Sequence, residues 1–208
     1  MARGYDLESR PANRHRRGHL AKDDDWIRDF LERAPMGYFA SRWDDQPFIH
    51  PMTYVYDADR HCIYAHGSIV GRRRANTDRH EKMAFCATEM GRLLPSNRAL
   101  HFSSQFRSVM AYGTIRHVED RGEMEHGLYS LIDKYFSPMA LNRDYSPIVQ
   151  EDIDRVTVFA LDIGSWSGKG NWKEKTDQNE GFPPLAPRWL EEEAFPMSFG
   201  RMAPERSG

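Results

Sequence analysis

FRSVMAYGTIRHV, residues 106–118, is the clearest strand signal in this 208-residue chain. Alternate residues from Val109 to His117 share one face, as they do in a strand, where side chains repeat with a period of two. Gly113 stands in the middle of the run, and a mid-strand glycine predicts the bend or bulge that barrels need when they turn corners. The stretch therefore predicts a long strand of an antiparallel barrel.

Shorter strand signals precede it. Residues 38–43 and 48–56 are rich in aromatic and branched side chains and are separated by a turn-rich link at 44–47. A second turn at 57–60 leads to another predicted strand at 62–65. Three short strands at such close spacing predict a meander, as in antiparallel barrels and sandwiches.

Further strands are predicted at 83–90, at 99–103 and, near the end of the core, at 155–163. Few helices separate them. A doubly wound α/β fold would need a helix between nearly every pair of strands, and the sequence lacks these. We therefore predict a mainly β fold, α+β in class, with a few peripheral helices around an antiparallel barrel.

The helices have clear signals of their own. The acidic run Asp23-Asp24-Asp25 is predicted to lie at the N-cap of an amphipathic helix that Pro35 and Gly37 end. Apolar residues at three- and four-residue steps predict a second helix over 120–136. A short helix is expected within 66–76, capped by Ser68.

Composition limits the class of protein. Lys and Arg number 29 against 31 Asp and Glu, and this near balance argues against a protein that coats nucleic acid or an anionic membrane. The two cysteines, Cys62 and Cys86, cannot form a disulfide framework or a four-thiolate zinc site. No apolar run approaches the ~18 residues of a membrane span, and the N-terminus has no secretory core. A cytoplasmic location is expected.

The chain divides into three parts. Residues 1–22 are basic and almost without apolar anchors, so we predict a flexible arm. Residues 23–172 carry all the strand signals and form the predicted barrel domain. Residues 173–208 are rich in Pro, Glu and Trp; they are expected to pack irregularly on the barrel or on a partner, with one short helix near Trp189.

The common catalytic signatures are absent from the sequence: there is no dinucleotide fingerprint, P-loop, nucleophile elbow or zinc-protease motif. His61, Cys62 and His66 fit no zinc spacing, so no metal site is predicted. These absences favour a binding site for a cofactor that is carried in.

The densest cluster of chemically active residues is Gly71-Arg72-Arg73-Arg74. Planar guanidinium groups suit the bidentate recognition of phosphate, and backbone N–H groups around residues 67–68 would add donors to the same anion. The alternative is a solvated charged face. Taken alone, the cluster does not decide between them.

Six segments carry a family resemblance together: DWIR at 25–28, IHPMTYVY at 49–56, IYAH at 63–66 leading to VGRRRAN at 70–76, LPSN at 94–97, FRSVMAYGT at 106–114 and WSGKGNW at 166–172. In their order and number, from Asp24 to Trp172, they resemble the pyridoxamine phosphate oxidase-like FMN-binding split barrels. Within that family the sequence looks closest to the nitroimidazole-resistance (Nim) reductases.

This resemblance implies an antiparallel FMN-binding split β-barrel that forms a homodimer with flavin held at the interface. It also implies which residues bind the cofactor. Pro51, Met52 and Thr53 would line the flavin ring. The resemblance assigns the phosphate to Arg72 with Arg73 or Arg74, beside Gly71, and the remaining contacts to Arg107, Ser108, Trp166 and Lys169.

His66 matches the Nim histidine that faces the flavin and the substrate, so the resemblance implies a catalytic and cofactor-binding role. It could protonate a reduced nitro oxygen or orient the ring. The alternative is a hydrogen-bonded structural histidine. His50 is a second candidate near the ring, and a turn-side structural role is favoured for it.

The leading hypothesis is an FMN-dependent oxidoreductase that reduces a nitroaromatic or similar small electrophile with electrons from a nicotinamide donor. Oxidation of pyridoxamine phosphate is disfavoured because no C-terminal Trp and Arg-x-His pattern is clear. Two alternatives stay open. One is a flavin-binding redox or storage module without efficient turnover; the other is a barrel that binds haem or another ligand, with His66 or His50 as axial ligand.

Overall fold

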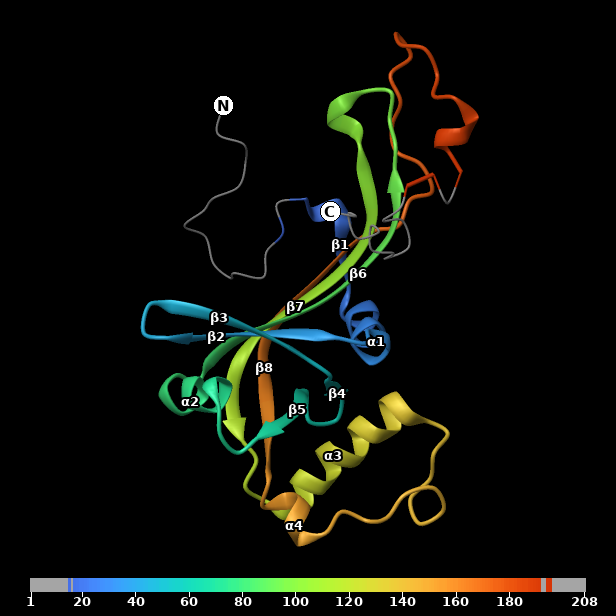
Figure 1. The fold of residues 1–208 in the computed structure, drawn as a ribbon. Helices are drawn as coiled ribbons and strands as arrows, with labels where there is room; N and C mark the ends of the chain where they lie inside the picture. The colour runs from blue at the N-terminus through green and yellow to red at the C-terminus, as the bar shows by residue number, and fades with distance from the viewer. Residues whose placement is uncertain (1–14, 16, 192–193, 196–208) are drawn as a thin grey trace, which may run out of the picture.

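The computed structural model describes residue 15, residues 17–191 and residues 194–195. In this part of the chain, eight strands form one sheet in the order β3-β2-β6-β7-β8-β5-β4, with β1 paired to β8 (Figure 1). Every pairing between named strands is antiparallel. The strands are β1 Ala21–Lys22, β2 Gly37–Trp43, β3 Gln46–Met52, β4 Val55–Asp57, β5 Cys62–Ser68, β6 Lys82–Leu94, β7 Ser103–His117 and β8 Val156–Asn171.

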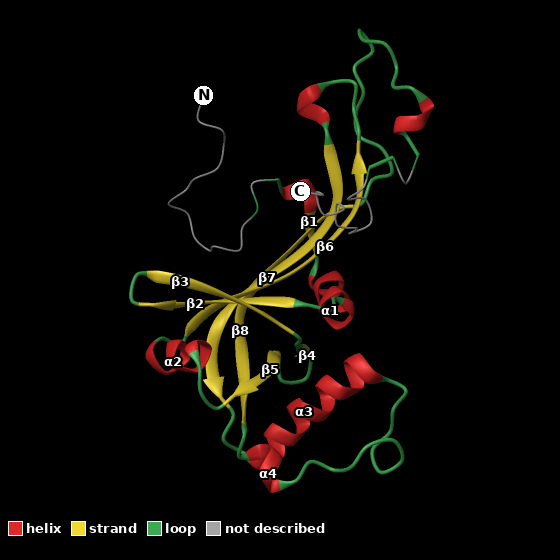
Figure 2. Ribbon diagram, in the orientation of Figure 1, coloured by secondary structure: helices red, strands yellow, loops and turns green. Residues whose placement is uncertain are grey.

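Helices are few and peripheral, as Figure 2 shows. The described residues include four α-helices and three short 3₁₀ turns, and the mainly β class predicted from the sequence is confirmed. The helices are α1 Asp24–Arg33, α2 Arg72–Arg79, α3 Arg121–Phe136 and α4 Gln150–Ile153; the 3₁₀ turns are η1 Gly18–Leu20, η2 Ala99–His101 and η3 Pro187–Trp189.

Strand β7 contains the long strand predicted from residues 106–118, except for Val118 at its end. Its register against β8 shifts between Tyr112 and Gly113. A Cβ atom at Gly113 would overlap the backbone carbonyl oxygen of Asp162 on β8. Only glycine fits this close approach, so the strand irregularity predicted at Gly113 is confirmed.

Helix α1 closes one side of the barrel core. The Asp23 side chain accepts a hydrogen bond from the Trp26 backbone N–H at 2.9 Å, which confirms the predicted cap. Its inward face buries Ile27, Phe30 and Leu31 in the main hydrophobic cluster. Burial of each such side chain stabilises the fold by ~1.5–3 kcal/mol.

Helix α3 covers a second, smaller cluster and confirms the helix predicted over 120–136. Asp120 caps it by accepting from the Glu123 N–H at 2.8 Å. Gly127 of the helix lies against the Tyr64 ring of β5, where a Cβ atom would be 3.3 Å from the ring. The helix crosses below β4 and β5 in Figure 1 and forms the floor of the barrel there.

The single strand predicted over 48–56 is wrong. β3 ends at Met52 and pairs with β2, whereas β4 begins at Val55 and pairs with β5. Between them the Tyr54 backbone N–H bonds to the Tyr135 hydroxyl of α3 at 3.0 Å instead of to a strand. This tertiary hydrogen bond and the burial of Tyr54 interrupt the strand between β3 and β4.

Residues 99–103 are not a strand either. Ala99–His101 form a 3₁₀ turn and β7 begins only at Ser103. The Ser96 hydroxyl accepts from the Arg98 N–H at 3.1 Å, and such local side-chain bonds compete with strand pairing.

The short helix predicted within 66–76 begins later than expected. β5 continues to Ser68, whose hydroxyl accepts from the Val70 N–H, and α2 starts at Arg72. Gly71 is its N-cap with φ of +131°, a conformation that glycine adopts without strain. The last strand is also longer than the predicted 155–163, since β8 runs on to Asn171; helix α4 was not predicted.

The described parts of the predicted N-terminal arm and C-terminal extension pack on the sheet. Ala21 and Lys22 form β1 against Lys169 and Gly168 of β8. Residues 173–191 bond to the outer end of the β6–β7 hairpin, which projects far from the barrel (Figure 1). Residues 1–14, 16, 192–193 and 196–208 of the two predicted segments lie outside the described residues.

Candidate functional site

The start of helix α2 is electrostatically unusual. No side chain caps its N-terminus, and its first turn contains three arginines and no acidic residue. The N-terminal end of a helix dipole is positive, so cations are disfavoured there and anions are favoured. The local sequence therefore leaves a positive end that an anion would stabilise.

The three arginines point to different partners. The Arg72 guanidinium lies over the Trp43 and Phe48 rings of the β2–β3 hairpin, 5.2 and 5.4 Å from their centroids. Arg74 donates to the Thr157 hydroxyl at 2.9 Å and is paired with the Asp78 carboxylate at 3.3 Å. Arg73 turns toward the barrel.

Arg73 is a half-buried cation without an acidic partner among the described residues. Its Nη1 donates to the Met52 sulfur at 2.6 Å, and its Nη2 donates to the His66 carbonyl oxygen at 3.3 Å. The guanidinium lies 4.5 Å from the Phe159 ring centroid, and its buried Nε has no hydrogen-bond partner. Burial lowers the pKa of Arg73. A Cβ atom at Gly67 would overlap Nη2, so this glycine makes room for the side chain.

A hydrogen-bonded chain orients His50 on the neighbouring hairpin. The buried Asn76 amide of α2 donates to the Ser41 hydroxyl at 2.8 Å, and the hydroxyl lies 2.7 Å from Nε2 of His50. Since Ser41 accepts from Asn76, its own proton is available to Nε2, and we assign His50 as the Nδ1–H tautomer. Partial burial and the positive charge of Arg73 lower the pKa of His50, which favours this neutral form.

His66 and Thr53 border a different space, an apolar cavity of about 450 Å³ beside α3. Its other walls are Leu128, Leu131, Ile132, Tyr135, Phe136, Ile148, Asp152 and Val156. Desolvation and the charge of Arg73 lower the pKa of His66, so the imidazole is neutral at pH 7. The cavity thus offers an apolar ring site with a neutral imidazole at its border.

β5 separates the two histidine environments. Successive side chains of a strand point to opposite faces, and Gly67 faces Arg73 while His66 borders the cavity beside α3. The His66 backbone carbonyl still contacts Arg73. The site therefore has a cationic side, formed by Arg73, and an apolar side, formed by the cavity beside α3. The two sides meet at the end of β5.

The residues predicted on β7 and β8 form a separate group. Arg107 is paired with Glu89 at 3.3 Å and lies 3.9 Å from the Trp172 ring centroid. Ser108 is in register with Lys169, whose ammonium lies 5.3 Å from the Phe106 ring. Counted along the sheet, Met52 on β3 is three strands from Ser108 on β7 and four from Lys169 on β8, about 14 and 19 Å at ~4.8 Å per strand.

The remaining predicted residues are spread around these groups. Trp166 donates from its indole N–H to Asp24 at 2.8 Å, at the start of α1. Pro51 is exposed in the row opposite Tyr38, while Met52 is buried in the core and contacts Arg73. One protomer thus brings Gly71, Met52, Thr53, His66 and Arg73 to one region, and the assignment of the full set to one flavin stays a prediction.

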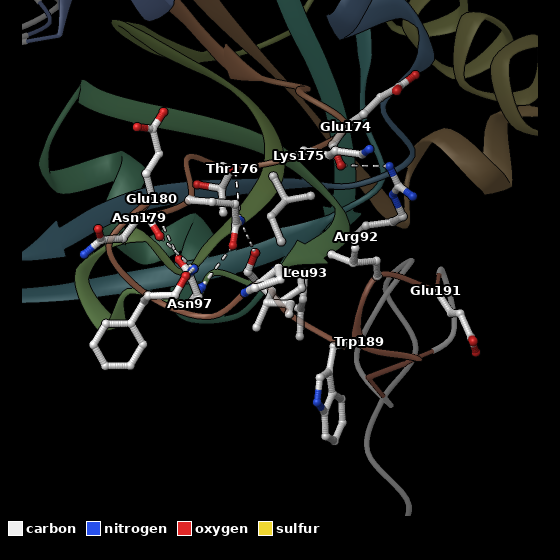
Figure 3. A pocket seen from close by; sticks show the side chains of 17 residues that line it. Arg92, Leu93, Asn97, Glu174, Lys175, Thr176, Asn179, Glu180, Trp189 and Glu191 are labelled. Carbon is white, nitrogen blue, oxygen red and sulfur yellow. Dashed lines mark hydrogen bonds between the residues drawn. The ribbon is translucent and has the colours of Figure 1, made fainter. Parts of the chain in front are cut away.

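Sequence reasoning missed Ser41 and Asn76, because nothing local indicates that they orient His50. It also missed a cavity of about 640 Å³ between the outer end of the β6–β7 hairpin and residues 174–191. Figure 3 shows Leu93 and Trp189 at this cavity, with Arg92, Glu174 and Lys175 above them and Asn97 bonded to the chain segment of Asn179. It lies at the opposite end of the molecule from α3 (Figure 1).

Neither a helix that could span a membrane nor a metal-binding cluster is found among the described residues. None of the helices there is long and apolar enough to cross a membrane. No set of three or more His, Cys, Asp or Glu side chains in that part of the chain is grouped so as to hold a metal ion.

Comparison with known proteins identifies the fold. A profile of the pyridoxamine 5'-phosphate oxidase family matches residues 23–170, which agrees with the family resemblance seen in the sequence. No curated protein gives a significant match. The mainly antiparallel architecture is that of the split barrels of this family.

Three solved structures share this fold. The flavocytochrome Anf3 from Azotobacter vinelandii has a TM-score of 0.73 and 22% identity, over 83% of this chain and 80% of that chain. An FAD and haem binding protein from Mycobacterium smegmatis has a TM-score of 0.70 and 18% identity, over 78% of each chain. A proposed 5-nitroimidazole antibiotic resistance protein from Bacteroides thetaiotaomicron has a TM-score of 0.60 and 18% identity, over 73% of this chain and 86% of that chain.

Proposed function

Because the chain belongs to the pyridoxamine 5'-phosphate oxidase family, we propose that it binds a flavin nucleotide and acts as a flavin-linked oxidoreductase. The observation that carries the proposal is Arg73. Its charge has no carboxylate partner among the described residues, its Nε is buried without a hydrogen bond, and it stands in the uncapped first turn of α2. A flavin phosphate would supply the missing negative charge.

The residues present fit such a cofactor. Gly67 leaves space for the Arg73 guanidinium, and Gly71 exposes the first N–H groups of α2 without a side chain over them. Guanidinium groups and helix N-termini are both favourable for phosphate. FMN, the flavin expected from the sequence, satisfies this requirement with its single phosphate.

When bound, a flavin supplies hydride and electron transfer, and the protein supplies binding and orientation. Arg73 and the N–H groups of α2 would hold the phosphate. His50, fixed by Ser41, would present its Nδ1–H as a hydrogen-bond donor. His66 would stay neutral at pH 7 and orient a substrate in the apolar cavity through a hydrogen bond.

We propose a nitroaromatic or similar small electrophile as substrate, reduced with electrons from a nicotinamide donor in the cytoplasm. The cavity beside His66 is lined by aliphatic and aromatic side chains, which suits a flat, uncharged ring. The proposed nitroimidazole resistance protein among the structural neighbours supports this substrate class.

The test is flavin retention after reconstitution and desalting, followed by reduction of a nitroaromatic with NADH or NADPH. We expect Arg73→Met to lower flavin affinity by more than tenfold, because a charged hydrogen bond contributes ~1.5–3 kcal/mol. Arg74→Met is the matched control, since Arg74 is already paired with Asp78. Equal loss in both variants would contradict the role of Arg73.

The nitroaromatic reduction assay distinguishes an enzyme from a flavin-binding storage or sensor module. Wild-type protein that retains flavin but oxidises neither nicotinamide in the presence of nitro compounds would support the module. Circular dichroism of each variant checks that the barrel is intact.

Haem binding at the α3 cavity is a second candidate function. A neutral imidazole is the usual axial ligand of haem iron, and His66 borders an apolar space beside α3. The flavocytochrome and the FAD and haem binding protein among the structural neighbours also favour this ligand.

Titration with haemin tests this candidate. Binding at the cavity would give a Soret band that His66→Ala abolishes and that His101→Ala leaves unchanged, because His101 lies on the outer end of the β6–β7 hairpin. A Soret band that persists in His66→Ala would argue against the assigned ligand.

A further inference from the structure

We propose that the chain has a second anion site, separate from α2, which binds a dianionic phosphate group. The site is a pocket of about 190 Å³ between residues 17–20 and residues 171–177, beside the end of β6. Four basic side chains line it: Arg17, His19, Lys173 and Lys175.

The pairing of β1 with β8 brings the N-terminal wall of the pocket into place. β1 is in register with Lys169 and Gly168, and η1, which precedes β1, contacts β8 as well (Figure 1). The Leu20 backbone N–H donates to the Arg17 carbonyl oxygen at 3.0 Å and closes the turn. Arg17 and His19 are therefore held beside the residues that follow the end of β8.

Hydrogen bonds to the β6–β7 hairpin hold the opposite wall. The Gln105 amide donates to the Lys173 carbonyl oxygen at 3.0 Å, and the Thr176 hydroxyl donates to the His101 carbonyl oxygen at 2.8 Å. These bonds fix the backbone on both sides of Lys175 and do not involve the ammonium group of either lysine. The two cations are thus positioned by their backbone and available to an anion.

The protein does not balance the charge of this pocket. The ion pairs within the described part of the chain involve none of its four basic side chains. Asp177 is the one carboxylate among the described residues that line it, whereas Glu174 lines the neighbouring cavity of about 640 Å³. Arg17 and the two lysines against one carboxylate leave a net charge of about +2, which a phosphate group of about −2 would neutralise.

The size and the donors of the pocket suit one phosphate group. Pockets that enclose a whole small molecule measure about 300–1,000 Å³, so this smaller pocket fits one group of a ligand. Lysine binds phosphate as a point charge and arginine as a planar fork. A phosphate group offers three acceptor oxygens, so it can reach donors on both walls, whereas a carboxylate offers two.

Two sources could supply this group, free inorganic phosphate and the 2′-phosphate of NADPH. The second source rests on the proposed function, in which a nicotinamide donor supplies the electrons. Asn171 lines the pocket two residues beyond Lys169 on β8, so the pocket adjoins the group formed by Ser108 and Lys169. A donor bound there would distinguish NADPH from NADH by its phosphate.

Calorimetric titration of the flavin-loaded protein with inorganic phosphate at low ionic strength tests the site. We expect the double variant Lys173→Met/Lys175→Met to bind phosphate at least tenfold more weakly than wild type, because two charged contacts are lost. Arg17→Met, on the opposite wall, should weaken binding as well and gives a second variant if the double variant is unstable.

The matched control is Arg42→Met/Lys82→Met. It removes the same charge from two exposed residues on β2 and β6, and Lys82 is at the opposite end of β6 from Leu94, which lines the pocket. Its phosphate affinity should stay within about twofold of wild type, since exposed charges this far apart are screened by salt.

The same titration with NADPH and NADH distinguishes the two sources. Tighter binding of NADPH than of NADH, lost in the lysine double variant, would identify the nicotinamide donor as the ligand. Equal affinity for both, together with phosphate binding that the double variant loses, would identify inorganic phosphate.

The outcomes also separate this site from the proposed flavin function. Absence of phosphate binding in wild type, or equal binding in the lysine double variant, would overturn the second anion site. Failure of the folded wild-type protein to retain flavin would overturn the flavin function instead. In that case Arg73→Met is added to every variant, so that α2 does not bind the titrant, and the same comparison still tests the pocket.

Discussion

Lys134 is a charged residue that the fold holds largely away from water. Its ammonium donates to the Leu31 carbonyl oxygen at the end of α1 at 3.0 Å and lies 3.7 Å from the Tyr54 ring centroid. Burial lowers its pKa to about 8, and the nearby carboxylate of Glu32 opposes this only weakly. Lys134 therefore links α3 to α1 through a hydrogen bond, and the desolvation of its charge lowers the free energy of unfolding.

We expect this cost to be visible in the pH dependence of stability. The folded-state pKa is below the unfolded value of 10.5, so below pH 8 both states are protonated and the full cost is present. As the pH rises from 8 to 10.5 the folded state loses its proton first, and the free energy of unfolding should increase by about 1–2 kcal/mol after allowance for solvent screening.

Urea denaturation of wild type and Lys134→Met at pH 7, 8, 9 and 10 measures this effect. The difference between the two proteins should shift in favour of wild type as the pH rises, because the other titrating groups are shared. A difference that is independent of pH would show that Lys134 titrates normally in the folded protein.

At the scale of elements, the sequence predicted what local patterns control. α3 has an apolar period and an Asp120 cap, and β7 has an alternating pattern around Gly113; both were predicted nearly to their ends. The break between β3 and β4 was not predicted because its cause is non-local. Tyr54 bonds to Tyr135, 81 residues away, and no pattern within 48–56 indicates that contact.

The same limit applies to the site. The arginine cluster at 72–74 was visible in the sequence, but the role of each arginine depends on its partners from other strands. Arg73 is distinguished by Met52 and Phe159, whose positions follow only from the closed barrel. The sequence could therefore indicate the segment that we propose binds phosphate, and could not select the residue within it.

At the scale of the whole molecule, one protomer does not bring all the family-assigned residues together. His66 is paired with Val158 of β8, whereas Lys169 lies eleven residues further along the same strand, about 35 Å away at ~3.3 Å per residue, and Ser108 of β7 is paired with Lys169. A single flavin could reach both groups if they come from two copies of the chain. This supports the homodimer expected from the family resemblance.

The projecting end of the β6–β7 hairpin supports the same arrangement. At this end the side chains of Leu100 and Phe102 are 88% and 61% exposed, and that of Phe182, in residues 173–191, is 64% exposed. Large apolar side chains gathered on a projecting element are typical of an interaction surface. We propose a second copy of the chain as the partner that covers them.

Light scattering after size exclusion tests this arrangement in the reconstituted protein. We expect a mass of twice 24.2 kDa for wild type. The double variant Leu100→Asp/Phe102→Asp should become monomeric and lose flavin together, because the two exposed positions contribute to association and hardly to the core. Leu141→Asp, an exposed position beyond α3, is the control and should stay dimeric. A monomeric protein that keeps its flavin would show that one chain completes the site alone.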